Sequence, residues 1–436
     1  MKKNRPSCGD FVRRSKNWIG WIPPAVVFGV LASPGEVAAQ PPGVVATLLN
    51  DVRVKSALQA ARASEPRTLD EQARFCEIPA PPFQERARGE ALRRAFQDAG
   101  LQNVRVDRAG NVLGDRPGLT PRPRLVLAAH LDTVFPEGTN VSVSRQGEVL
   151  RGPGIGDNCR GLGVLVAVAR ALQLAGVQTP GSMTFVANVG EEGLGDLRGM
   201  KALFGETMKG QIDRFVSIDG PGHHVSQVAI GSRRYRVTFK GPGGHSFGSF
   251  GQPNPAHAVG RAVAKVADIT VPSSPVTTFN VGRIGGGTSV NAIPDEAWLE
   301  IDLRSEHSPT LSSLDAKILA IFDAAAAEEN RRSPSGARIV VTKELVGDRP
   351  AGSIPPHAPI VQTVQAVSQA LFGTSAPLSR GSTDANLPLS LNIPAVTIGG
   401  GGEGADAHAA GETFTATESW KGTENAVLIA IALTQP

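Results

Sequence analysis

A histidine and an aspartate, His130 and Asp132, directly follow the apolar run at residues 125–129. Such a run is typical of a buried strand, on which side chains two positions apart point to the same side. We therefore expect both groups to face one cleft at the carboxyl end of the strand, where open α/β sheets bind their ligands. A metal ligand with the carboxylate that orients it has this composition, but so does a packed histidine that its neighbour satisfies. The pair alone does not decide between them.

Later segments of the chain repeat this pattern. Asp157 lies in a glycine-rich loop before a predicted helix, and Asp219 ends an apolar run at residues 215–218. Adjacent glutamates, Glu191 and Glu192, end the apolar run at residues 183–189, where their repulsion is unfavourable unless a cation lies beside them. His408 follows a predicted strand and four consecutive glycines. Acidic groups and histidines that end successive strands predict a cation site at one edge of a sheet.

Hydrophobic periodicity predicts the elements that carry these residues. Helical and strand patterns alternate before residue 231 and after residue 345, which indicates an α/β domain built from residues 40–230 and 346–436. Residues 231–345 follow the order strand, helix, strand, strand, helix, strand, as in a ferredoxin-like module inserted into that domain. The predicted strands are 103–106, 111–113, 125–129, 183–189, 215–218 and 395–398 in the α/β domain, and 234–240, 277–284, 297–303 and 338–345 in the module.

Composition and charge limit the classes of function. The chain has 436 residues, of which 41% are hydrophobic and 19% charged, as is usual for globular domains. Its formal net charge is +4, and residues 1–39 alone hold six basic residues against two acidic ones, so the rest of the chain is neutral. A nucleic-acid-binding surface is therefore not indicated. The three cysteines, Cys8, Cys76 and Cys159, suggest neither a disulfide framework nor a cysteine zinc site.

Residues 1–39 have the organisation of an export signal. A basic start precedes a mostly apolar run at residues 18–32, and Val37, Ala38 and Ala39 form a small-residue cleavage pattern before Gln40. Two prolines interrupt the apolar run, which is too short for a membrane span. We therefore expect a mature chain without stable membrane insertion, exported to the periplasm or secreted. If the segment is not a signal, the chain is cytoplasmic.

A serine hydrolase is the main alternative that the residues themselves offer. Residues 244–248 have the form G-x-S-x-G, and Ser246, Asp384 and His408 occur in the chain order of a serine-hydrolase triad. The nucleophile elbow of such enzymes needs a helix directly after the serine, whereas a loop with two prolines follows here. The triad also leaves the acidic strand ends without a role. The glycine-rich stretch at residues 151–163 lacks the spacing of a dinucleotide fingerprint.

Six motifs together resemble the M20 family of co-catalytic metallopeptidases, from about residue 65 to the end of the chain. They are H-L-D-T-V at 130–134, G-D-N-C-R-G at 156–161, G-E-E-G at 190–193, S-I-D-G at 217–220, G-G-H-S at 243–246 and A-H-A-A-G-E at 407–412. The resemblance implies a zinc-peptidase-like α/β domain with a central mixed sheet flanked by helices. It also implies that the inserted module is a lid that makes the contact of a homodimer.

By the same resemblance, the site holds two zinc ions and uses one carboxylate as a bridge. The implied ligands are His130, Asp157 and Asp219 for one ion, and Asp157, Glu192 and His408 for the other. Asp132 is implied to orient the first histidine, and Glu191 to be the general base. Asn158 stands where many relatives have aspartate, but that position is not a ligand in the family. Cobalt or manganese also fit this mixed nitrogen and oxygen set.

In the module, the resemblance implies that His245 reaches the active site of a partner subunit and that Asn291 and Arg304 contact substrate. The planar fork of an arginine suits a substrate carboxylate. Aspartate rather than glutamate at the last ligand position, Asp219, resembles the aminopeptidase and dipeptidase branches. We therefore expect hydrolysis of short peptides, with deacylation of N-acyl amino acids as the alternative. A non-catalytic peptide binder is disfavoured because every ligand and base position is filled.

Overall fold

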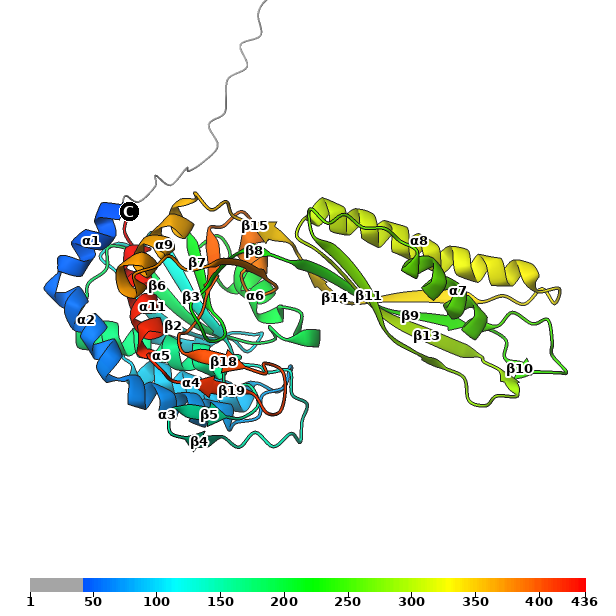
Figure 1. Ribbon diagram of the computed structural model, residues 1–436, viewed down its shortest axis with the longest axis horizontal. Coiled ribbons are helices and arrows are strands. Elements are labelled where there is room, and N and C mark those ends of the chain that lie inside the picture. The colour runs from blue at the N-terminus through cyan, green and yellow to red at the C-terminus, as the bar shows by residue number, and fades with distance from the viewer. Residues whose placement is uncertain (1–41) are drawn as a thin grey trace, which may run out of the picture. The chain divides into compact units, whose positions relative to one another are not determined.

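The computed structural model describes residues 42–436, and the predicted export signal lies outside this part. Figure 1 shows the order of its elements. Its α-helices are α1 (Pro42–Asn50), α2 (Val52–Ala63), α3 (Glu65–Cys76), α4 (Arg86–Asp98), α5 (Cys159–Leu174), α6 (Arg198–Ala202), α7 (Pro255–Ala267), α8 (Ser308–Arg332), α9 (Pro359–Phe372), α10 (Asn386–Ser390) and α11 (Trp420–Ala432). Among these described helices, none combines the length and apolar character that a membrane crossing requires.

A nine-stranded mixed sheet forms the centre of the α/β domain. Its strands are β1 (Gln102–Val106), β2 (Val112–Arg116), β3 (Arg124–His130), β6 (Ser182–Asn188), β7 (Arg214–Ile218), β8 (Val225–Ala229), β15 (Gly352–Ser353), β16 (Leu378–Gly381) and β17 (Ala395–Ile398). The order is β1-β2-β6-β3-β7-β17-β8-β15, with β16 paired to β8, and β6, β3, β7 and β17 run parallel. Parallel strands end at one edge, so the predicted site residues after β3, β6 and β7 meet there.

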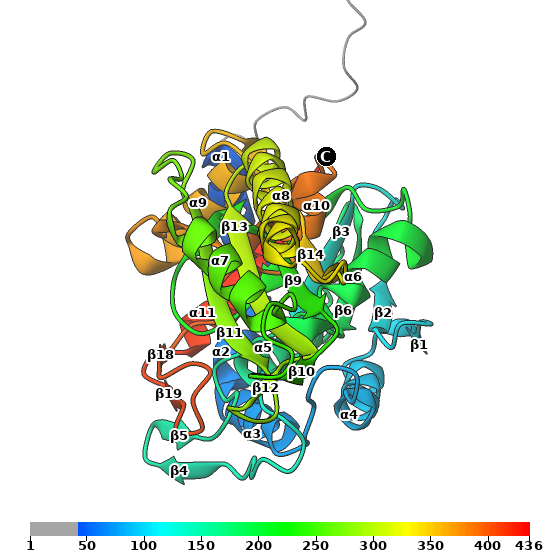
Figure 2. The same ribbon diagram turned by 90° about the vertical axis from the view of Figure 1, so that its right-hand side faces the viewer.

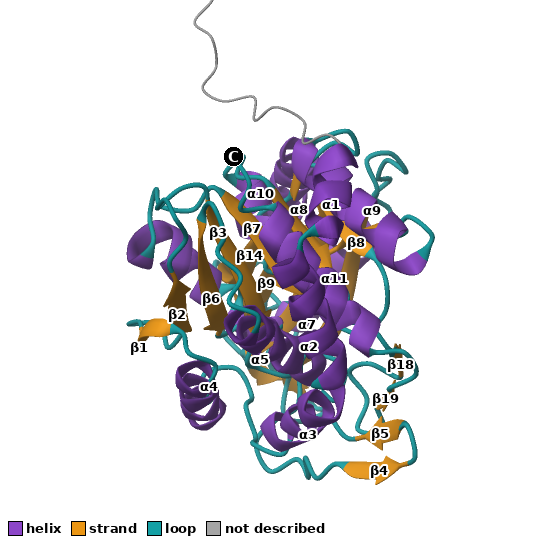
Figure 3. Cartoon of the chain, turned by 90° about the vertical axis from the view of Figure 1, so that its left-hand side faces the viewer, coloured by secondary structure: helices purple, strands orange, loops and turns teal. Residues whose placement is uncertain are grey.

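Apolar layers bury both faces of this sheet. Leu125, Leu127 and Ala129 of β3 pack into a core shared with α2, α5, α9 and α11, whereas Val126 and Ala128 pack into another core, shared with α6 and α10. Figure 3 shows α2, α5, α9 and α11 lying over one face of the sheet. The alternation along β3 is the period of two that a strand imposes. The apolar run is continuous because both of its faces are covered.

A separate four-stranded sheet joins two loops that are distant in the sequence. Its strands are β4 (Ser144–Gln146), β5 (Val149–Arg151), β18 (Glu403–Ala405) and β19 (Thr413–Thr415), in the order β18-β19-β5-β4. Because β19 pairs with β5, the loop of His408 between β18 and β19 lies beside the loop of Asp157 after β5. These strands are three residues long and mostly exposed, so they contain no apolar run that would predict them.

The inserted module has the predicted ferredoxin-like order. Strands β9 (Gly231–Lys240), β11 (Thr277–Gly286), β13 (Glu296–Ser305) and β14 (Val340–Arg349) form an antiparallel sheet in the order β11-β13-β9-β14. Helices α7 and α8 cover one face and complete the module's own apolar core (Figure 2). Two features differ from expectation. Strand β14 continues four residues past the predicted end at residue 345, and short strands β10 (Gly244–His245) and β12 (Ala292–Ile293) pair outside this sheet.

Candidate metal centre

The structure brings the predicted metal ligands together in two groups that share Asp157. In the first group, Nε2 of His130 lies 3.1 Å from Oδ1 of Asp157 and 3.5 Å from Oδ1 of Asp219. In the second group, Nε2 of His408 lies 3.1 Å from Oδ2 of Asp157 and 3.2 Å from Oε1 of Glu192. The candidate ligand atoms of each group all lie within 4.8 Å of one another. Asp157 thus presents one carboxylate oxygen to each histidine, as a bridging ligand does.

The chemistry of these groups fits bound divalent cations. Hydrogen bonds to Asp157 and Glu192 raise the pKa of His408 to about 10. Burial alone lowers the pKa of His130, but the neighbouring carboxylates of Asp132, Asp157 and Asp219 raise it well above its usual value. Both raised pKa values reflect the carboxylates gathered around the two imidazoles, whose negative charge two bound cations could balance. Two imidazoles and three carboxylates are a donor set that suits zinc.

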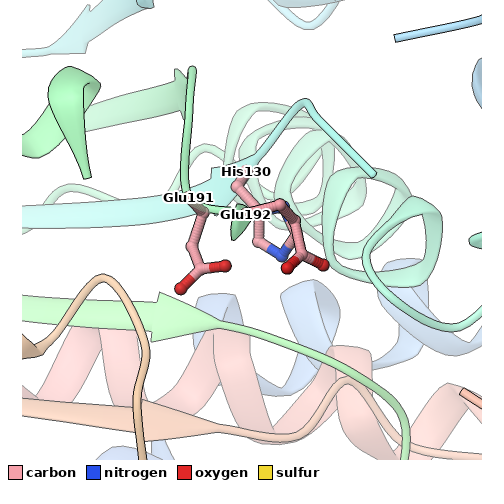
Figure 4. Close-up of side chains that lie close together, drawn as sticks. All are labelled: His130, Glu191 and Glu192. Carbon is pink, nitrogen blue, oxygen red and sulfur yellow. The ribbon is translucent and has the colours of Figure 1, made fainter. Parts of the chain in front are cut away.

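Asp132 lies beside His130, but its backbone makes the closer contact. Nδ1 of His130 is 3.0 Å from the backbone oxygen of Asp132 and 3.7 Å from the carboxylate. The carboxylate instead accepts hydrogen bonds from the backbone N–H groups of Glu191, at 3.0 Å, and Glu192, at 2.8 Å. A carbonyl acceptor keeps the proton on Nδ1 and leaves Nε2 free for a metal. The carboxylate of Asp132 thus fixes the turn that carries both glutamates. Figure 4 shows the side chains of these glutamates close to His130.

Two residues to which the sequence analysis gave no role hold the loop of Asp157. The carboxylate of Glu412 accepts hydrogen bonds from three backbone N–H groups between residues 154 and 157, at 2.8–3.0 Å. The side chain of Asn158 donates to the backbone oxygen of Ile218, at 2.9 Å, just before Asp219. An aspartate in place of Asn158 could not donate this bond. Glu412 stands in the last of the six motifs, but only the fold shows what it binds.

An arginine from the inserted module holds Glu191. Nη1 of Arg349, at the end of β14, donates to Oε1 of Glu191 at 2.9 Å, and Nη2 donates to its backbone oxygen. Both side chains are buried, with 5% and 6% of their surface exposed. Burial raises the pKa of Glu191 well above its usual value, and the charge of Arg349 opposes this rise. Glu191 also lies in ligand distance of His130 and Glu192, but its bond to Arg349 makes it better placed as a base than as a ligand.

A cavity of about 410 Å³ lies over the two ligand groups, and Arg304 of the module belongs to its lining. The other two module residues, His245 and Asn291, are not part of this lining. They lie together instead, because β10 pairs with β12 and the backbone N–H of Ser246 donates to the backbone oxygen of Asn291 at 2.9 Å. His245 is exposed there. Contact of His245 or Asn291 with substrate therefore stays a prediction.

Ser246 lacks the surroundings of a nucleophile. It lies in a loop after β10, and the next helix begins only at Pro255. Asp384 is buried and accepts a hydrogen bond from Asn188 at 2.8 Å, while Nε2 of His408 faces the carboxylates of the metal centre. Across residues 42–436, no hydrogen bond links the side chains of Ser246, Asp384 and His408. The geometry therefore speaks against the serine-hydrolase alternative.

Comparisons with known proteins agree with this geometry. The sequence profile described as peptidase family M20/M25/M40 matches residues 126–431. The uncharacterized protein YqjE of Bacillus subtilis (strain 168) is 25% identical, over 84% of this chain and 98% of its own length. Succinyl-diaminopimelate desuccinylase of Corynebacterium glutamicum is also 25% identical, over 53% of this chain and 64% of its own length. A solved tripeptidase from Staphylococcus aureus shares the fold, with a TM-score of 0.71 and 23% identity over 85% of this chain and 99% of its own.

Proposed function

This chain belongs to peptidase family M20/M25/M40, and from that membership we propose that it is a two-zinc hydrolase of short peptides. The observation that carries the proposal is the pair of donor groups that share Asp157, with the carboxylate of Glu191 beside them. Exhaustive chelation and the substitution Glu191→Ala are each expected to abolish turnover. Activity that survives either treatment contradicts the proposal.

The chain's own side chains supply two metal positions. The residues that would hold the ions are His130, Asp157 and Asp219 at one position, and Asp157, Glu192 and His408 at the other. When bound, a pair of zinc ions lowers the pKa of a water molecule and polarises the amide carbonyl. The backbone carbonyl of Asp132 keeps the imidazole of His130 in the orientation that such a position needs.

Glu191 carries the proton in the proposed reaction. Its carboxylate takes a proton from the attacking water and delivers it to the amine nitrogen as the C–N bond breaks, which yields a free carboxylate and a free amine. Arg349 favours the charged form of this base, against the effect of burial on the pKa of Glu191. The carboxylate of Asp132 holds the base in place through the backbone N–H of Glu191.

The proposed substrate is a peptide of two or three residues with a free amino terminus. The tripeptidase fold and the aspartate at position 219 support this substrate. The relative named as a desuccinylase supports the alternative, an N-acyl amino acid. Purified zinc-loaded protein can be tested on a panel of dipeptides and tripeptides against N-acetyl and N-succinyl amino acids. Turnover of acyl amino acids alone contradicts the peptidase proposal.

A homodimer whose modules complete each other's active sites is the proposed assembly. The support is the exposed position of His245 on β10, outside the lining of its own subunit's cavity. Light scattering measures the mass in solution. In addition, inactive His245→Ala and inactive Glu191→Ala proteins should regain activity when they are mixed and allowed to exchange subunits. A monomer, or a mixture without recovery, contradicts this assembly.

Export is proposed from the composition of residues 1–39, with their basic start, apolar run and small-residue end. A reporter enzyme that folds only outside the cytoplasm, fused after Gln40, tests this directly. Active reporter supports export, and reporter retained in the cytoplasm contradicts it. Substitution of the basic residues in the start of the segment should reduce export.

A further inference from the structure

The lining of the cavity over the metal centre contains charged groups of both signs. Four carboxylates and four arginines belong to this lining: Asp157, Glu191, Glu192 and Asp219, and Arg234, Arg304, Arg349 and Arg380. The rest of the lining consists of glycines, serines, threonines and two histidines, without an apolar side chain. Arg349 is bonded to Glu191, a carboxylate of the lining, whereas the other three arginines pair with Asp302 and Glu306, which lie outside the lining. Apart from the candidate metal ligands and Glu191, the lining is therefore basic and polar.

Arg234 and Arg304 share one carboxylate. Nε of Arg234 lies 3.0 Å from Oδ1 of Asp302, and Nε of Arg304 lies 2.6 Å from its Oδ2. Arg234 is the cross-strand partner of Asp302, and Arg304 is two residues further along β13, so all three lie on the sheet face that α7 and α8 leave open. Two guanidinium groups with one carboxylate leave a surplus positive charge. Within residues 42–436, neither Nη atom of Arg304 has a hydrogen-bond partner.

Arg380 adds a positive group from a different element. It lies on β16, its Nη1 donates to Glu306 of the module, and 56% of its side chain is exposed. Neither Glu306 nor Asp302 belongs to the cavity lining, so a ligand in the cavity meets guanidinium N–H donors rather than their acidic partners. The flat fork of a guanidinium matches a carboxylate with two parallel hydrogen bonds.

We propose that these three residues, Arg234, Arg304 and Arg380, form an arginine wall that selects amide substrates with two carboxylates. One carboxylate binds between Arg234 and Arg304, and the other binds to Arg380. The inference rests on the proposed amide hydrolysis and names its substrate class: acidic dipeptides, and N-acyl amino acids with an acidic acyl group. A substrate without a second carboxylate leaves one of these basic positions unpaired, and the polar lining offers little contact to an apolar side chain.

Calorimetric titration with glutarate tests the arginine wall without any turnover. Zinc-loaded protein is expected to bind glutarate at least tenfold more tightly than butyrate, since only glutarate has a second carboxylate. Arg380→Gln and Arg234→Gln should each weaken glutarate binding about 10- to 100-fold, the range for a charged bidentate contact. Arg283→Gln is the matched control, because Arg283 is exposed, pairs with Glu300 and lies outside the cavity lining. Unchanged binding in Arg380→Gln, or the same loss in Arg283→Gln, overturns the proposal.

Kinetics separates a failure of the arginine wall from a failure of the proposed function. The expected result is a lower KM for alanyl-glutamate than for alanyl-alanine, with Arg380→Gln raising KM for the acidic substrate alone. If both peptides are hydrolysed with equal KM, the hydrolase stands and the arginine wall is refuted. If no amide is hydrolysed but glutarate binding depends on Arg380, the proposed function fails and the dicarboxylate site stands.

Discussion

Replacement of Arg349 by methionine tests how far this arginine favours the charged form of Glu191. Nη1 of Arg349 lies 2.9 Å from Oε1 of Glu191, and both side chains are almost wholly buried. Methionine occupies much of the same space without charge. Burial is the main influence that raises the pKa of Glu191, and Arg349 is the main influence that lowers it. The substitution is therefore expected to raise the pKa of Glu191 further.

Loss of this ion pair is expected to lower the free energy of unfolding, by an amount that depends on pH. Removal of one partner from a buried ion pair costs about 3–5 kcal/mol in the free energy of unfolding. A carboxyl whose folded-state pKa lies above its unfolded value stabilises the fold below the unfolded pKa, and this contribution is lost as the pH rises through the folded pKa. The deficit of Arg349→Met relative to the wild type should therefore be larger at pH 8 than at pH 5. The acid limb of kcat/KM should move to higher pH, because the base must be deprotonated to act.

Thermal unfolding at both pH values and a pH–rate profile measure these effects. Arg170→Met is the matched control, because Arg170 donates to Glu71 at 2.7 Å in another buried pair, outside the cavity lining. It should destabilise the protein and leave the acid limb in place. Arg349→Lys retains the charge and should keep the acid limb near its wild-type position. An unmoved acid limb in Arg349→Met, or an equal shift in Arg170→Met, refutes the reasoning.

Three further predictions concern the metal centre. Glu191→Gln should keep its zinc and lose about 10²- to 10⁴-fold in kcat, since it removes only the proton transfer; metal analysis that shows lost zinc would make Glu191 a ligand instead. Glu412→Gln removes the negative charge that accepts hydrogen bonds from the backbone N–H groups of Gly156 and Asp157. This substitution should weaken zinc binding about 10- to 100-fold in a chelator competition. Equal zinc affinity in this variant and the wild type would mean that the carboxylate of Glu412 does not support the metal centre. Because the pKa values of His130 and His408 are both raised, zinc binding to these imidazoles should release protons. Calorimetry in buffers of different ionisation enthalpy counts these protons, and a count of zero contradicts the assigned ligands.

The ends of the central strands could be predicted from local sequence alone. His130, Glu192 and Asp219 each come at or just after an apolar run, and a run buried on both faces marks the strand and its end. Parallel strands then bring these ends to one edge of the sheet, independently of the conformation of the connecting loops. The positions of these three residues at one sheet edge therefore follow from short-range patterns. Their proposed roles come from the resemblance of the motifs to those of the family.

The partners of Arg349 and Glu412 could not be predicted in this way. Arg349 binds a carboxylate 158 residues earlier in the chain, and Glu412 binds a backbone N–H 255 residues earlier. Periodicity reports whether a segment is buried, but it does not report which distant group an arginine or a carboxylate meets. The predicted end of the last module strand at residue 345 lies before Arg349 for a local reason, since Gly347 and Asp348 interrupt the apolar alternation near the end of β14.

The direction of synthesis constrains when the metal centre can form. Strand β19 pairs residues 413–415 with residues 149–151 of β5, so the loop of Asp157 gains its anchor, Glu412, only after almost the whole chain has been made. Pairings across so long a separation form late, because a large loop must close before they contribute. A nascent chain that ends before β18 has His130 but neither His408 nor the anchor. If the chain binds two metals as proposed, tight binding is expected only of chains made past residue 412, and metal content would then serve as a measure of completed folding.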